Sequence, residues 1–191
     1  MGIRCRYRSM KYCGSTPALR HAINPINGNR QILTDNSGSF LGPALGSPTD
    51  LIFDDRDDAN PANDRVLVKD GLAILVVQKD TGAKSILSDN SSTSTADFVQ
   101  PRGLALDKEG DNLLVYDVND PEINIMGRIH EVALNSGVRS LLSIDPIDFP
   151  SNSSAGLVLD DTNKRAFAVS RQLQAIIIID LQSGESAIMS K

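Results

Sequence analysis

Short apolar segments separated by turn residues run along most of the chain. Segments such as "VLVKD", "LLVYD" and "AILVVQ" are rich in Val, Leu and Ile and are bounded by Gly, Pro, Asn or Asp. This pattern is typical of β-strands on a half-buried, pleated surface. Because no segment keeps an apolar period of 3.6 residues over the length of a helix, the pattern predicts an all-β protein.

Four such segments recur in the same order. The first ends in an aspartate that returns every 53 residues, at Asp54, Asp107 and Asp160. The second ends in aspartate in two copies and in Ser170 in the third, the next closes on a Gly-containing turn, and a fourth completes the unit. The last two segments also occur once earlier, at residues 21–36. The chain therefore holds about three and a half copies of an internal repeat.

A unit of four short strands in about 50 residues has the size and content of one β-propeller blade. One blade cannot bury both of its faces, so neighbouring blades must stack to form a core. We therefore predict an all-β, β-propeller-like array of four-stranded antiparallel blades that forms an incomplete ring. Residues 18–36 would form half a blade, residues 37–90, 91–145 and 146–191 one full blade each, and residues 1–17 a basic segment outside the fold.

The stretch "QPRGLALDKEGDNLLVYD" at residues 100–117, followed by "GRIHEVALNSG", resembles the NHL repeat in its Pro-x-Gly-aliphatic-x-aliphatic-Asp opening and its Gly turn. The whole unit, with its "GNRQILTDN" and "GAKSILSDN" tails, is similar to the SMP-30/gluconolactonase-like six-bladed propellers of bacteria. The resemblance covers residues 21–191. It implies a ring with more blades than this chain holds. The chain would then be a fragment of a longer propeller protein, a truncated reading frame, or one of two copies that assemble into one ring, and we favour the fragment.

Composition narrows the classes of function. A net charge of −5 and a pI of about 5.0 argue against the basic groove of a nucleic-acid-binding protein. No stretch approaches the roughly 20 apolar residues of a membrane span, and the N-terminus lacks the apolar stretch of a secretory signal. Cys5 and Cys13 fit neither a CxxC motif nor a zinc site. The resemblance to exported bacterial propellers implies a periplasmic or extracellular location.

The repeated aspartates at strand ends allow two interpretations. Acidic groups at equivalent positions would ring a central channel and bind a cation or a polar ligand, or each would accept backbone N–H groups in its own turn. Repetition in every unit favours the structural role, because a binding site rarely needs the same group from each blade. These residues are Asp54, Asp107, Asp160, Asp70 and Asp117.

The densest acidic cluster is the run "DDRDDANPAND" at residues 54–64. Its candidate ligands for Ca²⁺ or another divalent cation are Asp54, Asp55, Asp57 and Asp58. Counted from Asp55, the acidic and Asn residues do not alternate as in an EF-hand loop, and no glycine stands at the sixth position. We therefore favour a solvated loop and predict no cofactor.

Four polar residues are candidates for a ligand site: Asp50, Arg102, Asn112 and His130. A His130–Glu131 pair would suit acid–base work, but adjacent strand residues point to opposite faces, so we expect a surface or groove histidine. No G-x-S-x-G nucleophile motif is present. The sequence favours a non-catalytic module that binds a protein or a small polar ligand. A fragment of an SMP-30-like metal-dependent hydrolase is the alternative, and the question of catalysis stays open.

The terminal blades of the array lead to a further prediction. A terminal blade exposes a face that is buried elsewhere in a repeat array, so we expect self-association through these uncapped blades. We also expect functional differences where the copies differ, in the insertions at residues 55–64 and 118–126 and at the channel-facing strand ends.

Overall fold

The strands of the computed structural model form four antiparallel sheets. The structure describes residues 20–23, 27–55, 64–91, 97–117, 127–144, 156–170 and 174–190. These residues contain β-strands and no helix, so none of them forms a helix that could cross a membrane. The predicted all-β array of four-stranded antiparallel blades is confirmed. Residues 1–17 lie outside the described residues.

The sheets follow one another along the chain as blades 1 to 4. Blade 1 has two strands, β1 (Arg20–Ile23) and β2 (Arg30–Thr34). Blade 2 has β3 (Pro48–Asp54), β4 (Arg65–Asp70), β5 (Ala73–Gln78) and β6 (Lys84–Asp89). Blade 3 has β7 (Pro101–Asp107), β8 (Asn112–Asp117), β9 (Arg128–Ala133) and β10 (Arg139–Ile144). Blade 4 has β11 (Leu157–Asp160), β12 (Arg165–Ser170), β13 (Ala175–Asp180) and β14 (Ser186–Ser190).

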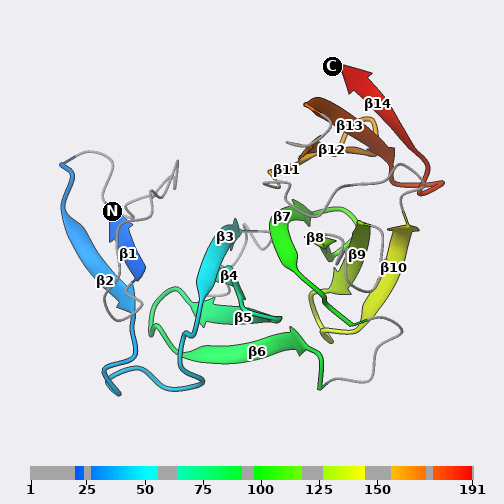
Figure 1. Cartoon of the computed structure of the whole chain (residues 1–191). Helices are drawn as coiled ribbons and strands as arrows, with labels where there is room; N and C mark the ends of the chain where they lie inside the picture. Colours follow the sequence, from blue (N-terminus) through cyan, green and yellow to red (C-terminus); the bar gives the residue numbers. More distant parts are fainter. Residues whose placement is uncertain are drawn as a thin grey trace.

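The four blades stand side by side in an open arc (Figure 1). The first strand of each full blade, β3, β7 or β11, lies on the inner side of the arc, and the last strand lies on the rim. The inner strands β3 and β7 contact each other, as do β7 and β11. The start of one inner strand is therefore brought close to the start of the next.

Each blade repeats one irregularity in its last strand. The pairing between the last two strands skips one residue, at Leu33, Leu87, Leu142 and Met189 in turn. An unpaired extra residue of this kind is a β-bulge, which bends the strand and increases its twist. The sequence repeat thus extends to the geometry of the backbone.

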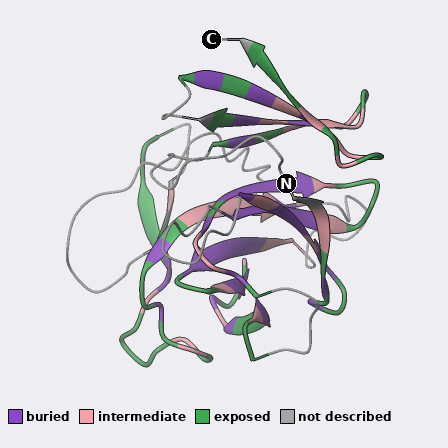
Figure 2. Cartoon of the chain, turned by 45° about the vertical axis from the view of Figure 1, so that its right-hand side comes forward, coloured by how far each residue is buried: buried purple, intermediate pink, exposed green. Residues whose placement is uncertain are grey.

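Apolar layers between successive blades form the core (Figure 2). Alternate residues of each strand point to opposite faces, so a full blade contributes to two layers. The layer between blades 1 and 2 includes Leu33, Val66, Val68 and Val77. The layer between blades 2 and 3 includes Leu67, Ile74, Val76, Leu113, Val115 and Val132. The layer between blades 3 and 4 includes Leu114, Tyr116, Ile129, Ala166, Ala168 and Ile177.

A buried cation closes the rim between blades 1 and 2. Lys84, the first residue of β6, donates hydrogen bonds to the hydroxyl of Thr34 at 3.1 Å and to the carbonyl of Asp35 at 2.8 Å. Its ammonium also lies 5.8 Å from the ring centre of Phe40. The start of one rim strand is thereby held against the end of the rim strand of the preceding blade.

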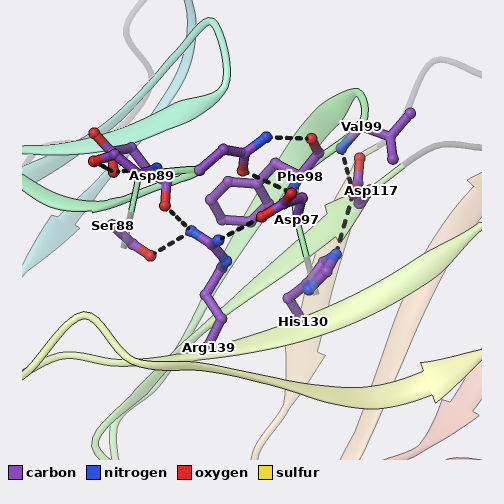
Figure 3. Close-up of polar contacts among 10 residues, drawn as sticks. Ser88, Asp89, Asp97, Phe98, Val99, Asp117, His130 and Arg139 are labelled. Carbon is purple, nitrogen blue, oxygen red and sulfur yellow. Dashed lines mark hydrogen bonds and ion pairs between the residues drawn. The ribbon is translucent and has the colours of Figure 1, made fainter. Parts of the chain in front are cut away.

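Arg139, the first residue of β10, has the same role between blades 2 and 3 (Figure 3). Its guanidinium donates to the hydroxyl of Ser88 at 2.9 Å and to the carbonyl of Asp89 at 2.6 Å. It also lies 4.4 Å from the ring centre of Phe98 and 3.6 Å from the carboxylate of Asp97. We call each such contact of a cation with the preceding rim strand a rim clasp.

The rim clasp leads to a stability prediction. Arg139→Met keeps much of the side-chain volume but removes the charge-assisted hydrogen bonds, and we expect it to lower the free energy of unfolding by about 2 kcal/mol. Arg139→Lys should lose less than half of that, because Lys84 makes the equivalent contacts in the preceding junction. Urea denaturation of the two variants measures the difference. Equal losses for Met and Lys would show that the clasp contributes little.

Candidate functional site

The second-strand aspartates Asp70 and Asp117 hold their own blades together. Asp70 accepts hydrogen bonds from the backbone N–H groups of residues 46 and 47. Asp117 accepts the equivalent bonds from residues 99 and 100, at 2.9 and 2.6 Å. Each carboxylate ties the end of the second strand to the segment that enters the first strand. Their repetition therefore reflects a structural role, although the donors precede the blade instead of lying in the turn that follows.

The first-strand aspartates act at the opposite end of the blades. Asp107 and Asp160 each accept the backbone N–H group of the third residue that follows, at 3.0 and 3.2 Å. Asp54 instead accepts the Nε–H of Arg65 at 2.8 Å. These are the contacts of turn-closing residues.

The metal candidates are only partly described. Asp54 is paired with Arg65, and Asp55 contacts the ammonium of Lys108. Asp57 and Asp58 lie outside the described residues. Within the described part of the chain, no group of three or more His, Cys, Asp or Glu is arranged to hold a metal ion. A cation site at residues 54–58 stays a prediction.

The four ligand candidates do not form one site. Asn112 begins β8 and pairs with Asp107, so it lies at the far end of blade 3 from Arg102, near the start of β7. His130 pairs with Val115 in the middle of the sheet. Only Asp50 and Arg102 lie at the same end of neighbouring inner strands.

The expectation of a surface or groove histidine at position 130 is wrong, because His130 is fully buried. Its Nε2 lies 3.1 Å from the carboxylate of Asp117, and its ring meets the edge of Phe98 at 5.2 Å between ring centres (Figure 3). Among the described residues, Nδ1 of His130 has no hydrogen-bond partner. Phe98 belongs to the apolar layer between blades 2 and 3, so the buried pair packs against this junction.

Asp50 joins blade 2 to blade 3. Its carboxylate accepts the N–H groups of Leu51 at 2.9 Å and of Leu104 in the next blade at 3.0 Å. Burial raises the pKa of Asp50 overall, although both hydrogen bonds act to lower it. The equivalent register position in blade 3 is Gly103, which has no side chain to repeat the contact. This bridge is therefore particular to the junction of blades 2 and 3.

Lys69 completes a polar cluster that the sequence analysis missed. It pairs with Asp50 across β3 and β4 and is only 6% exposed. Burial lowers the pKa of Lys69, and the positive charge of Arg102 lowers it further, whereas the nearby carboxylates of Asp70, Asp50 and Asp117 raise it. We call Asp50, Lys69 and Arg102 the inner-strand cluster.

The ammonium of Lys69 lacks a hydrogen-bond acceptor among the described residues. The three carboxylates whose charges act on it already accept two backbone N–H groups each. Arg102 is exposed, and its guanidinium contacts the side-chain oxygen of Gln100 at 3.2 Å. The cluster therefore presents one buried and one exposed cation with free donor capacity.

Comparison of the repeated segments identifies Lys69 as a residue that differs from its equivalents in the other blades. In register, Lys69 corresponds to Tyr116 in blade 3 and to Val169 in blade 4. A lysine at a position that takes aromatic or apolar side chains in the other copies is a departure from the pattern. Comparing the segments "VLVKD", "LLVYD" and "AFAVS" for differences would have revealed it.

Comparison with known proteins identifies the architecture. No family model and no curated protein matches the sequence. The structure is similar to a chain of the nidogen–laminin complex, with a TM-score of 0.53 and 15% identity over 89% of this chain and 70% of that one. It is also similar to TolB from Acinetobacter baumannii, with a TM-score of 0.54 and 13% identity over 89% of this chain and 37% of TolB.

A 6-phosphogluconolactonase-like protein of Bacteroides fragilis gives a TM-score of 0.51 at 15% identity, over 88% of this chain and 46% of that one. The chain is an incomplete β-propeller. It spans less than half the length of TolB and of the Bacteroides protein. At these identities the likeness establishes the fold, and it assigns the propeller to neither the NHL nor the SMP-30 group.

Proposed function

We propose that this propeller is a non-catalytic binding module, and that the inner-strand cluster receives a carboxylate group of its ligand. The observation that carries the proposal is the largely buried Lys69 side chain, whose ammonium has no acceptor among the described residues. A largely buried lysine whose ammonium has no hydrogen-bond partner in the protein is unfavourable for the free fold. A ligand oxygen would supply the missing acceptor.

The two cations of the cluster suit a carboxylate. The guanidinium of Arg102 is exposed and planar, which allows two parallel hydrogen bonds to one carboxylate, and Lys69, whose charge interacts with that of Arg102, adds a second positive charge. Asp50 is held by two backbone N–H groups and keeps the inner strands β3 and β7 in place. Ligand sites of repeat propellers are found at strand ends and loops, which is where this cluster lies.

Binding should depend on Lys69. We expect succinate, citrate or a short acidic peptide to bind the wild-type chain in isothermal titration calorimetry. Lys69→Met should weaken this binding at least about tenfold, because a hydrogen bond to a charged group contributes about 1.5–3 kcal/mol. Lys108→Met is the matched control, since Lys108 lies in the turn after β7 and contacts Asp55. Equal affinity of the Lys69 and Lys108 variants would refute the site, and so would the absence of binding by every probe.

The same substitution should stabilise the free protein. Because burial lowers the pKa of Lys69, the folded state disfavours the ammonium relative to the unfolded chain. Wild-type stability should therefore gain an increment as the pH rises from the lowered pKa of Lys69 toward its ordinary value of about 10.4. We expect Lys69→Met to melt at a higher temperature at pH 7 and to lack this alkaline increment. A lower melting temperature would indicate a structural role for Lys69.

A further inference from the structure

The junctions of blades 1 and 2 and of blades 2 and 3 share a glycine contact besides the rim clasp. Gly82 and Gly137 each precede the clasp cation by two residues. A Cβ atom on Gly82 would collide with the carbonyl oxygen of Leu33, and one on Gly137 with the carbonyl oxygen of Leu87. Both carbonyls belong to the bulge residue of the preceding rim strand. Each of these junctions therefore brings two parts together. One blade supplies the turn with the glycine and the cation, and the preceding blade supplies the bulged rim strand and an apolar face.

Blade 4 has the bulged rim strand and the apolar face of such a junction. Among the described residues, no further blade packs against them. Val158, Phe167 and Ile178 form one row across the sheet, and Val169 and Ile176 form a second row on the same face. Val158, Val169 and Ile176 are 63%, 47% and 41% exposed. The bulge residue of β14, Met189, is 61% exposed.

The same rows are buried in the blades that precede it. In blade 2 the rows are Ile52–Leu67–Val76 and Lys69–Ile74, and in blade 3 they are Ala105–Leu114–Glu131 and Tyr116–Ile129. Most of these residues are under 10% exposed. The apolar composition of the blade 4 rows therefore matches a surface that another blade covers.

Blade 1 has the other part of such a junction, the turn that carries the glycine and the cation. Gly28 and Arg30 occupy the positions of Gly82 and Lys84, at the turn into β2 and at its first residue. Gly28 has the same left-handed backbone, with φ of +71°, but a Cβ atom there would meet nothing within 4 Å. Arg30 is exposed, whereas Lys84 and Arg139 are buried. Within the described residues, this turn has no preceding rim strand to contact.

We propose that a second copy of this chain docks head to tail, with its Gly28–Arg30 turn against the outward face of β11–β14. Each copy carries both complementary halves of a contact that the chain makes twice within itself, so the occupant is specified by the chain's own junctions. The interface is heterologous, because different surfaces meet. A dimer therefore keeps one unoccupied Gly28–Arg30 turn and one unoccupied blade 4 face. These can close into a ring or bind further copies of the chain.

Sedimentation velocity of the full chain across a range of concentrations tests the proposal. We expect concentration-dependent association of the wild-type chain and at least about tenfold weaker association for Ile176→Glu, which charges the face, and for Gly28→Ala, which adds the Cβ that the contact excludes. Leu72→Glu is the control, since Leu72 is 47% exposed in the turn between β4 and β5. A wild-type chain that stays monomeric, or association that both variants leave unchanged, would overturn the proposal.

Mixing the two variants tests the head-to-tail geometry. Ile176→Glu retains the Gly28–Arg30 turn, and Gly28→Ala retains the apolar face, so a mixture should restore one intact interface and form a dimer of near wild-type affinity. A symmetric interface formed by two blade 4 faces would give no such rescue. Association of the wild type without rescue in the mixture would therefore contradict the head-to-tail arrangement.

Discussion

Asp117→Ala is expected to lower the free energy of unfolding by about 4 kcal/mol, because it removes a buried carboxylate that has several partners. Asp117 is 1% exposed and accepts two backbone N–H groups at the entry to β7, and it also contacts His130. Alanine would leave Nε2 of His130 buried without an acceptor and would remove the acceptor of the two half-buried N–H groups of Val99 and Gln100. Urea denaturation followed by circular dichroism measures the loss.

Asp160→Ala is the matched control for this substitution. Asp160 is another repeated strand-end aspartate, but it is 29% exposed and accepts hydrogen bonds from Asn163 in an exposed turn. Water can replace it there, so the expected loss is under about 1 kcal/mol. Similar losses at Asp117 and Asp160 would show that burial does not distinguish the two sets of repeated aspartates.

Gly137→Ala is expected to lower the free energy of unfolding by about 3 kcal/mol or more, through overpacking of the junction and a strained backbone. The new Cβ would collide with the carbonyl oxygen of Leu87, and this backbone atom cannot move without shifting β6 against β10. Gly28→Ala separates the two contributions, because Gly28 has the same φ of +71° and open space around it. It should lose only the backbone part, about 1 kcal/mol.

Both glycine variants should be compared by chemical denaturation at a protein concentration low enough to keep the chain monomeric. Equal losses would mean that the Leu87 carbonyl yields easily and that the glycine is retained for its backbone conformation alone. A larger loss at Gly137 supports the close packing of blade against blade.

The fold was predictable because the information that specifies it is local and repeated. Strand segments such as "LLVYD" and turns such as "NSG" indicate strands and hairpins without reference to distant residues, and their recurrence indicates stacked blades. The bulges and the contacts of Gly82 and Gly137 were not predictable, because they depend on how one blade meets the next. Of the insertion at residues 55–64 only the two end residues are described, and the insertion at residues 118–126 lies outside the described residues.

The candidate site was predicted less well, for a physical reason. Attention to the repeated aspartates selected residues that serve the scaffold, since Asp70 and Asp117 close their own blades. His130 and Lys69 lie on strands that are covered on both faces, so alternation along the strand does not reveal that either side chain is buried. Only the departure of Lys69 from Tyr116 and Val169 at its register position distinguishes the cluster.

A ligand site at Lys69 is tested most directly by NMR titration of the lysine side chains, with Lys69 assigned through the Lys69→Met variant. We predict that the Lys69 ammonium in the free protein titrates at lower pH than the other lysines, because it is buried beside Arg102. We also predict that adding citrate shifts its resonance and raises its pKa. A Lys69 that titrates together with the other lysines and does not respond to citrate or to any other carboxylate probe would contradict the proposed site.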